Sequence, residues 1–212
     1  FLSNKKIFKK PKFILELLKH HANAVLTKEW LNEKINSGQL NLDCIFYTYW
    51  FDSVTTGILL LKNTYNDLKV ITRAHGYDLY EEKRRGGYIP FRYKDMIDID
   101  YVFTVSKAGN NYLKEKYPKQ KNKIILSYLG IPDKKIENPI NLKQELNIVS
   151  CSMIVPVKRV DLILESLTYF VQKYNVKVNW THIGDGYERK KIEEKLKNMQ
   201  VKNLTVNLLG FV

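Results

Sequence analysis

The sequence predicts an α/β fold in two Rossmann-like lobes, each with a parallel sheet. Three observations support this class. Short β-branched and aromatic runs alternate with amphipathic runs of helical period along most of the chain. This alternation stops at a charged segment, residues 134–145, and then restarts. The length of 212 residues and the hydrophobic content of 44% suffice for one large core or two modest ones.

The first lobe is predicted to span residues 1–133. Its basic, partly amphipathic start, residues 1–23, is expected to enter a helix at Pro11, because proline suits the first helical turn. A second helix is predicted over 28–36, with Gly38 ending it. The following elements are predicted as strands at 44–50, 68–74, 101–105 and 123–128, with helices at 53–62 and 106–116.

The second lobe is predicted to span residues 146–212, after a linker at 134–145. Its first strand, 146–152, is short and β-branched, which is typical of a parallel strand covered on both faces. Lys158 and Arg159 then precede a helix whose first turn carries Asp161. This arrangement suits a phosphate site at a helix N-terminus, and an ordinary βα unit with solvated lysines explains it equally well. The further elements are helices at 160–173 and 187–198 and strands at 176–183 and 204–209, and the lobe is expected to be incomplete.

Composition narrows the function classes. The net charge of +13 favours an anionic partner, whether phosphorylated substrate, lipid surface or nucleic acid, although a solvated basic surface accounts for it as well. Cys44 and Cys151 lie in strand-like runs and are expected to be buried, reduced thiols. No cysteine or histidine spacing fits a metal site, and no secretory signal, long apolar run, G-x-S-x-G elbow or Walker motif is present.

Two polar segments are expected to carry function in the first lobe. His75 and Asp78 directly follow the strand at 68–74, and ligands of parallel sheets bind at the carboxyl ends of strands. The pair could instead only cap a turn and a helix. The segment 79–92 mixes charged residues, glycines and tyrosine, which is typical of a functional loop, and its candidate binding residues are Arg84, Arg85 and Tyr88.

A glycine turn, Gly184-Asp185-Gly186, follows the predicted strand at 176–183. A dinucleotide fingerprint needs a third glycine at position 189, where Arg189 stands, and the turn lies on the second βα unit of its lobe. A dehydrogenase is therefore excluded. The turn still predicts a close approach of backbone to a ligand.

Three motifs of the second lobe occur in order: residues 150–161 (SCSMIVPVKRVD), 181–186 (THIGDG) and 208–211 (LLGF). Together they resemble the donor-binding half of family 4 glycosyltransferases, which have the GT-B fold. Upstream, residues 73–80 (RAHGYDLY) and 87–92 (GYIPFR) are similar to the subgroup that makes exopolysaccharides such as colanic acid and amylovoran. The resemblance covers most of the chain from Cys44 onward.

The resemblance implies a role for each matching position. It makes His75 the catalytic histidine beside the transferred sugar and Lys158 a contact of the donor diphosphate. The family arginine five residues before this lysine is replaced by Met153, which leaves two alternatives: Arg159 substitutes for it, or the donor binds weakly. The donor-binding set is then Met153, Lys158, Arg159, Gly184, Asp185 and Gly186, and the acceptor-side set is Asp78, Arg84, Arg85 and Tyr88.

The function implied by the resemblance is retaining, metal-independent transfer of a hexose in bacterial surface polysaccharide synthesis. The donor is expected to be a UDP- or GDP-sugar and the acceptor a lipid-linked or growing saccharide, in the cytoplasm and peripherally at the inner face of the plasma membrane. The family's first strand and its acidic donor-sugar motif have no counterpart here, so the chain is expected to be truncated at both ends and inactive alone. A sugar-nucleotide epimerase of similar shape is the enzymatic alternative. A basic protein that binds membrane surfaces or nucleic acid is the other, and nucleic acid is disfavoured because the aromatic residues lie in strand-like runs.

Overall fold

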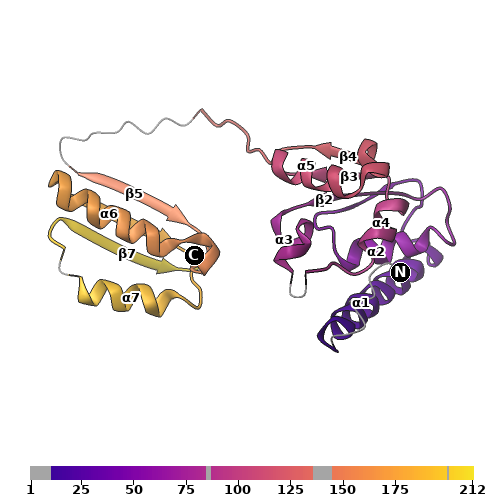
Figure 1. The fold of residues 1–212 in the computed structure, drawn as a ribbon, viewed down its shortest axis with the longest axis horizontal. Helices are drawn as coiled ribbons and strands as arrows, with labels where there is room; N and C mark the ends of the chain where they lie inside the picture. Colours follow the sequence, from indigo (N-terminus) through magenta and orange to yellow (C-terminus); the bar gives the residue numbers. More distant parts are fainter. Residues whose placement is uncertain (1–10, 85–86, 136–144, 200) are drawn as a thin grey trace. The chain divides into compact units, whose positions relative to one another are not determined.

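A computed structural model describes residues 11–84, 87–135, 145–199 and 201–212. The chain divides into two compact units, residues 1–132 and 133–212 (Figure 1). Most of the predicted linker, residues 136–144, lies outside the described residues. Within them, no helix is both long and apolar enough to cross a membrane.

Unit 1, residues 1–132, is built on a parallel sheet with strand order β1-β2-β3-β4. Thr48 pairs with Thr72, and Ala74 with Thr104, so the strands end at the same edge of the sheet. The segments that follow β1 and β2 therefore start side by side, and together they form part of a polar cavity. The strands are β1 (Ile45–Thr48), β2 (Lys69–Ala74), β3 (Tyr101–Thr104) and β4 (Ile124–Leu126).

The helices of unit 1 are α1 (Pro11–Asn36), α2 (Ser53–Leu61), α3 (Gly76–Leu79), α4 (Arg92–Asp98) and α5 (Lys107–Lys116), with the 3₁₀ turns η2 (Glu81–Lys83) and η3 (Pro118–Lys123). Their apolar faces and the sheet enclose one core, which includes Phe46, Leu61, Val70, Met96 and Leu113. Ser106 caps α5 through the amide of Gly109, as the sequence predicts.

Helix α1 is one helix of 26 residues, so the prediction of a separate helix over 28–36 is wrong. No glycine or proline interrupts the chain between Pro11 and Asn36, and Ala24 and Leu31 continue one buried face across the expected break. Gly57 lets α2 approach α1 closely, since an added Cβ atom would lie 2.5 Å from the carbonyl oxygen of Ala24. This close crossing brings α1 against α2, and both helices contribute residues to the cavity described below.

Helix α4 corrects a second prediction, because the segment 79–92 is not an open loop throughout. It contains η2, and Arg92 begins a helix of seven residues. Two turns are too short to show a helical period in sequence. Phe91 precedes α4 with a φ of 59°, a left-handed backbone that is strained for a bulky residue.

Unit 2, residues 133–212, has a parallel sheet with order β5-β6-β7. Its elements are β5 (Leu146–Cys151), η4 (Pro156–Lys158), α6 (Val160–Tyr174), β6 (Val178–Ile183), α7 (Arg189–Asn198) and β7 (Leu204–Gly210). Trp180, Leu164 and Ile192 centre its core. The predicted apolar face of α6 is confirmed, because Val160 and Leu164 are buried and Ile163 and Leu167 pack against that core.

The expectation that β5 is covered on both faces is wrong for the described part of the chain. Its residues alternate between half-buried and exposed, and Val149 is 67% exposed. The core of unit 2 draws on one face of the sheet only, the face that carries Ile148, Trp180 and Val206. Periodicity shows that a strand is apolar, but not which neighbours cover it.

The two cysteines are exposed, which contradicts the expectation of buried thiols. Cys151 lies on the exposed face of β5. Cys44 precedes β1, and its thiol donates a hydrogen bond to the carbonyl oxygen of Asn41 at 3.0 Å. The exposure of Cys151 therefore follows from the one-sided packing of β5, whereas Cys44 is exposed because it lies before β1 begins.

Candidate functional site

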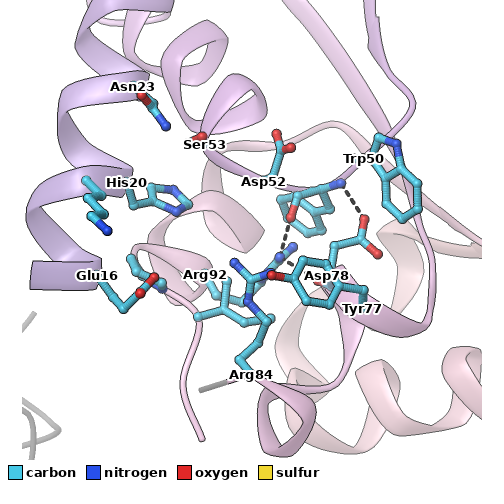
Figure 2. Close-up of a pocket in the computed structure, with 14 residues that line it drawn as sticks. Glu16, His20, Asn23, Trp50, Asp52, Ser53, Tyr77, Asp78, Arg84 and Arg92 are labelled. Carbon is cyan, nitrogen blue, oxygen red and sulfur yellow. Dashed lines mark hydrogen bonds between the residues drawn. The ribbon is translucent and has the colours of Figure 1, made fainter. Parts of the chain in front are cut away.

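A cavity of about 460 Å³ lies in unit 1, between α1, the segment after β1, α3 and the segment before α4. Figure 2 shows its side chains converging from these elements. The lining combines aromatic, basic and acidic groups. The lining residues are Glu16, Lys19, His20, Asn23, Trp50, Phe51, Asp52, Ser53, Tyr77, Asp78, Arg84, Ile89, Pro90 and Arg92.

Asp78 joins the segments that follow β1 and β2. Its carboxylate accepts hydrogen bonds from the amides of Phe51 and His75, each at 2.6 Å, and the residue is only 3% exposed. Charge-assisted bonds of this length are the strong kind. Asp78 therefore shapes the cavity wall, and its helix-capping geometry matches the simpler of the two sequence interpretations.

Arg92 is the main residue that sequence analysis missed. It is 3% exposed, and its Nη2 donates to the carbonyl oxygens of Phe51 and Asp78 (Figure 2). Its guanidinium carbon lies 3.4 Å from the ring centre of Phe51. Nε and Nη1 have no hydrogen-bond partner, and no carboxylate within the described residues lies close enough to pair with this cation. Burial lowers the pKa of Arg92, yet a guanidinium stays protonated in proteins.

A buried chain of hydrogen bonds starts at His20 in the cavity wall and continues into the interior of unit 1. Thr56 donates to the carboxylate of Asp95 at 2.7 Å, and its hydroxyl oxygen lies 2.8 Å from Nε2 of His20. Burial raises the pKa of Asp95 to about 7. Burial, followed by the positive charges of Arg92, Arg84 and His21, lowers the pKa of His20 to about 4.

His75 lies beside the cavity, not in its wall. The rings of Trp50 and Tyr49 flank its imidazole at centroid distances of 4.4 and 4.6 Å. Its side chain is 12% exposed, neither ring nitrogen has a hydrogen-bond partner among the described residues, and Nδ1 lies 4.0 Å from the Asp78 carboxylate. The structure thus brings His75 and Asp78 together at the carboxyl end of β2, but only Asp78 lines the cavity. An imidazole with two free nitrogens can still bind or move a proton.

The other acceptor-side residues differ in position. Arg84 lines the cavity and stacks on the ring of Tyr77 at 4.1 Å. Tyr88 is half-buried against Phe13, with a centroid distance of 6.2 Å, and burial raises its pKa to about 12. Arg85 lies outside the described residues.

In unit 2 the loops after β5 and β6 lock together through backbone. The amide of Ile154 donates to the carbonyl of Asp185 at 2.9 Å. A Cβ atom at Gly184 would lie 2.1 Å from the Ser152 carbonyl oxygen, and one at Gly186 would lie 2.3 Å from that of Ile154. The two glycines are therefore required by contact between the loops, a reason that the motif alone does not reveal.

The predicted donor-binding side chains project from these loops. Lys158 ends η4, is exposed and forms no ion pair within the described residues. Arg159 has a φ of 53°, is exposed, and pairs with Asp161 at 3.3 Å. Met153 is 55% exposed, and the amide of Met153 lies 3.6 Å from the Cβ position of Gly184. Asp185 accepts from the amide of Gly186 at 2.7 Å and pairs with Arg189 at 3.3 Å.

His182 supports this loop from the core. Its Nε2 donates to the carbonyl oxygen of Ser152 at 3.0 Å, which leaves Nδ1 to accept from the hydroxyl of Ser150 at 2.8 Å. Trp180 donates to the same hydroxyl oxygen at 2.9 Å. All hydrogen-bonding groups of the imidazole are thus satisfied, and its role is to fix the loop after β5.

Comparison with solved structures identifies the fold. A TarM mutant from S. aureus, solved with Fondaparinux, alpha-GlcNAc-glycerol and UDP, matches 89% of the chain with a TM-score of 0.59 and 18% identity. OtsA in its apo form matches 91% with a TM-score of 0.63 and 13% identity. The pneumococcal O-GlcNAc transferase GtfA, solved with UDP and GlcNAc, matches 86% with a TM-score of 0.56 and 14% identity.

The chain has the GT-B fold. It spans 36%, 52% and 37% of the lengths of the TarM, OtsA and GtfA chains, and the three described strands of unit 2 are consistent with a partial second lobe. At these identities the similarity establishes architecture alone. No family model matches the sequence, and no curated protein sequence matches it.

Proposed function

We propose that this chain belongs to a retaining glycosyltransferase that moves a hexose from a UDP- or GDP-sugar to a saccharide acceptor. Unit 2 holds the nucleotide sugar, and the cavity of unit 1 holds the acceptor. The observation that carries the proposal is the cation Lys158 beside the N-terminus of α6, on a loop locked to the glycine turn at the carboxyl ends of the strands. Two of the similar structures contain UDP together with a sugar.

In the proposed transfer reaction, four features of the chain have a defined role. Charge develops on the leaving diphosphate, and a cation fixed in place beforehand stabilises it. Lys158 supplies that cation, and the turn at Gly184–Gly186 holds the nucleotide side of the loop. His75, held through its amide by Asp78, contacts the sugar under transfer. No metal takes part in this scheme.

The cellular setting belongs to the same proposal. The acceptor is a lipid-linked or growing saccharide in exopolysaccharide synthesis, and the enzyme works peripherally at the cytoplasmic face of the membrane. The basic, partly apolar sequence before residue 24 supports attachment to an anionic surface.

Donor binding tests the proposal directly. Calorimetric titration of the chain with UDP and GDP should show binding of one of them, with random-sequence DNA as the competitor for a merely basic protein. Lys158→Gln should weaken nucleotide binding about tenfold, because one charge-assisted hydrogen bond is lost. Lys177→Gln, which removes an exposed cation next to β6, is the matched control and should leave binding unchanged. Equal loss in both variants would point to general electrostatics and refute the proposal.

His75→Ala tests the catalytic part, in a protein that contains this chain together with a complete second lobe. Release of UDP or GDP from the donor should fall by about a hundredfold, the scale of a lost interaction in the transition state, while nucleotide affinity stays within about twofold. Loss of affinity with turnover preserved at saturation would make His75 a binding residue. Conversion of the donor into an epimer without nucleotide release would favour the epimerase alternative.

A further inference from the structure

His20 is a buried side chain in the wall of the unit 1 cavity, and only one of its two ring nitrogens is engaged. The residue is 8% exposed, and its Nε2 lies 2.8 Å from the hydroxyl oxygen of Thr56. Nδ1 has no hydrogen-bond partner among the described residues, yet it is not one of the unpartnered atoms that are closed off from solvent. Since His20 lines the cavity, the open side of Nδ1 faces that space. Figure 2 shows the imidazole reaching from α1 toward Asp52 and Arg92.

The hydrogens available between His20 and Asp95 fix the form of the imidazole. The Thr56 hydroxyl has one hydrogen, and its nearest acceptor is the carboxylate of Asp95 at 2.7 Å. The other acceptor of this hydroxyl among the described residues is the carbonyl oxygen of Asp52 at 3.3 Å. Neither acceptor can donate while Asp95 is ionised, so the hydrogen between Thr56 and His20 comes from Nε2. A neutral imidazole with its hydrogen on Nε2 carries a lone pair on Nδ1.

The surroundings of His20 keep the imidazole uncharged and select the kind of group that it can bind. Burial, followed by the positive charges of Arg92, Arg84 and His21, lowers the pKa of His20 to about 4. The same charges disfavour a cationic donor at Nδ1, so a neutral hydroxyl group is the donor that fits. The other ionisable groups of the cavity wall are Glu16, Lys19, Asp52, Tyr77 and Asp78.

We propose that His20 is a ligand-binding residue of this cavity, whose Nδ1 accepts a hydrogen bond from a neutral hydroxyl group, and that Thr56 and Asp95 are positioning residues that keep the imidazole hydrogen on Nε2. The inference rests on the proposed function only in assigning this hydroxyl group to the saccharide acceptor. It adds a specificity-determining contact from α1, a helix that carries none of the sequence motifs.

Protonation of Asp95 should reverse the direction of these hydrogen bonds. Burial raises the pKa of Asp95 to about 7, and Asp98 adds to this, whereas Thr56, Arg92 and Lys94 oppose it. Below that pH the carboxyl group donates to the Thr56 oxygen, and the Thr56 hydrogen turns to Nε2 of the imidazole. The imidazole hydrogen then resides on Nδ1, which donates into the cavity. A hydrogen-bond direction that changes with pH is a signature that a merely structural contact would not give.

NMR spectroscopy of the nitrogen-15-labelled chain tests the positioning part without a ligand. Two-bond correlations between ring nitrogens and carbon-bound protons identify the nitrogen of His20 that carries the hydrogen. We expect Nε2 at a pH of about 8.5 and Nδ1 at a pH of about 5.5, with the change centred near the pKa of Asp95. Thr56→Val should abolish this change, Thr56→Ser should restore it, and His182 in the core of unit 2 should show no such change. The same form at both pH values, or an unaltered change in Thr56→Val, would overturn the positioning role.

Methyl α-glucoside and its permethylated form test the binding part, because the two share a ring and only the first has hydroxyl hydrogens. At a pH of about 8.5, methyl α-glucoside should shift the Nδ1 resonance of His20, and the permethylated form should not. His20→Phe should weaken binding of methyl α-glucoside about threefold to tenfold, the scale of one hydrogen bond. His21→Phe, at an exposed position outside the cavity wall, is the matched control and should leave binding unchanged.

Three results would overturn the binding role of His20. They are no shift of Nδ1 with methyl α-glucoside, equal shifts with both glucosides, and equal losses in His20→Phe and His21→Phe. Binding of UDP or GDP is measured separately through Lys158 in unit 2. Failure at His20 with nucleotide binding retained therefore removes this inference alone, and loss of nucleotide binding removes the proposed function.

Discussion

The cavity of unit 1 and the glycine loop of unit 2 are organised in opposite ways. In unit 1 the polar side chains themselves are fixed, since Asp78 and Arg92 are buried and hold the segments after β1 and β2 through hydrogen bonds to backbone. In unit 2 the backbone is fixed, because Gly184 and Gly186 pack directly on the loop after β5, while Lys158, Arg159 and Met153 are exposed.

This difference has a consequence for mutagenesis. Side-chain substitutions in the unit 1 cavity should change stability and binding together. In unit 2 the same kind of substitution should change binding alone, and only a change of backbone freedom should affect folding. Substitutions in each unit test this separation, and the largest effect is expected at a glycine.

Gly184→Ala should unfold unit 2 or destabilise it by about 3 kcal/mol or more. The added methyl group would lie 2.1 Å from the Ser152 carbonyl oxygen, and the φ of 127° is unfavourable for alanine. Urea unfolding followed through the fluorescence of buried Trp180 measures the loss. Gly130→Ala, where nothing lies within 4 Å of the new atom, is the control and should change stability little.

Asp78→Asn should lower the free energy of unfolding of unit 1 by about 2–3 kcal/mol. An amide lacks the negative charge, and its NH₂ group faces one of the two donor amides, those of Phe51 and His75. Chemical unfolding of the variant, compared with Asp67→Asn at an exposed position, measures the effect. A neutral result would show that the cavity wall is held by other contacts, and the contrast between the units would disappear.

Sequence predicts the parts of this molecule that depend on local pattern. The alternation of strands and helices and the placement of His75 and Asp78 after β2 follow from periodicity and from the rule for parallel sheets. The chain His20–Thr56–Asp95 could not be predicted, because its members lie on three helices and only the close crossing at Gly57 brings two of them together. The buried position of Arg92 could not be predicted for a similar reason, since it depends on the short helix α4 and on Phe51, 41 residues earlier. One-sided packing of β5 likewise depends on which elements cover the sheet.

Asp95 and His20, the two ends of the buried hydrogen-bond chain in unit 1, should give the free energy of unfolding opposite pH dependences that cancel. Asp95 keeps its proton in the folded state up to pH of about 7 but only to about 3.8 when unfolded, so its stabilising contribution is lost as pH rises from 4 to 7. His20 is neutral when folded down to pH of about 4 but gains a proton below 6.5 when unfolded, so its contribution is lost as pH falls through that window. Between pH 4 and 6.5 the two slopes oppose each other.

Asp95→Asn should reveal the pH dependence that His20 alone gives to the free energy of unfolding. Relative to the unchanged chain, the stability of the variant should rise by about 1.4 kcal/mol per pH unit between pH 4.5 and 6.5. Urea unfolding at three pH values measures this difference, and Asp67→Asn, which removes an exposed carboxylate, should run parallel to the unchanged chain across the window. Parallel profiles for Asp95→Asn would show that Asp95 is ionised in the folded state, and unit 1 would then contain a second buried carboxylate besides that of Asp78.

Met153→Arg should change binding without changing folding, which is the prediction specific to unit 2. The new cation would stand on the loop after β5, close to the turn at Gly184, and one charge-assisted hydrogen bond to the donor diphosphate should tighten UDP or GDP binding about tenfold. Arg159→Ala should weaken that binding less than about twofold, because Arg159 is exposed and already paired with Asp161. Calorimetry on both variants, with unfolding curves as the control for structure, separates the two positions. A severe loss of affinity in Arg159→Ala, together with no gain in Met153→Arg, would show that Arg159 has taken over the missing charge. An exposed side chain on a loop would then contribute as much to ligand binding as one buried in the cavity of unit 1.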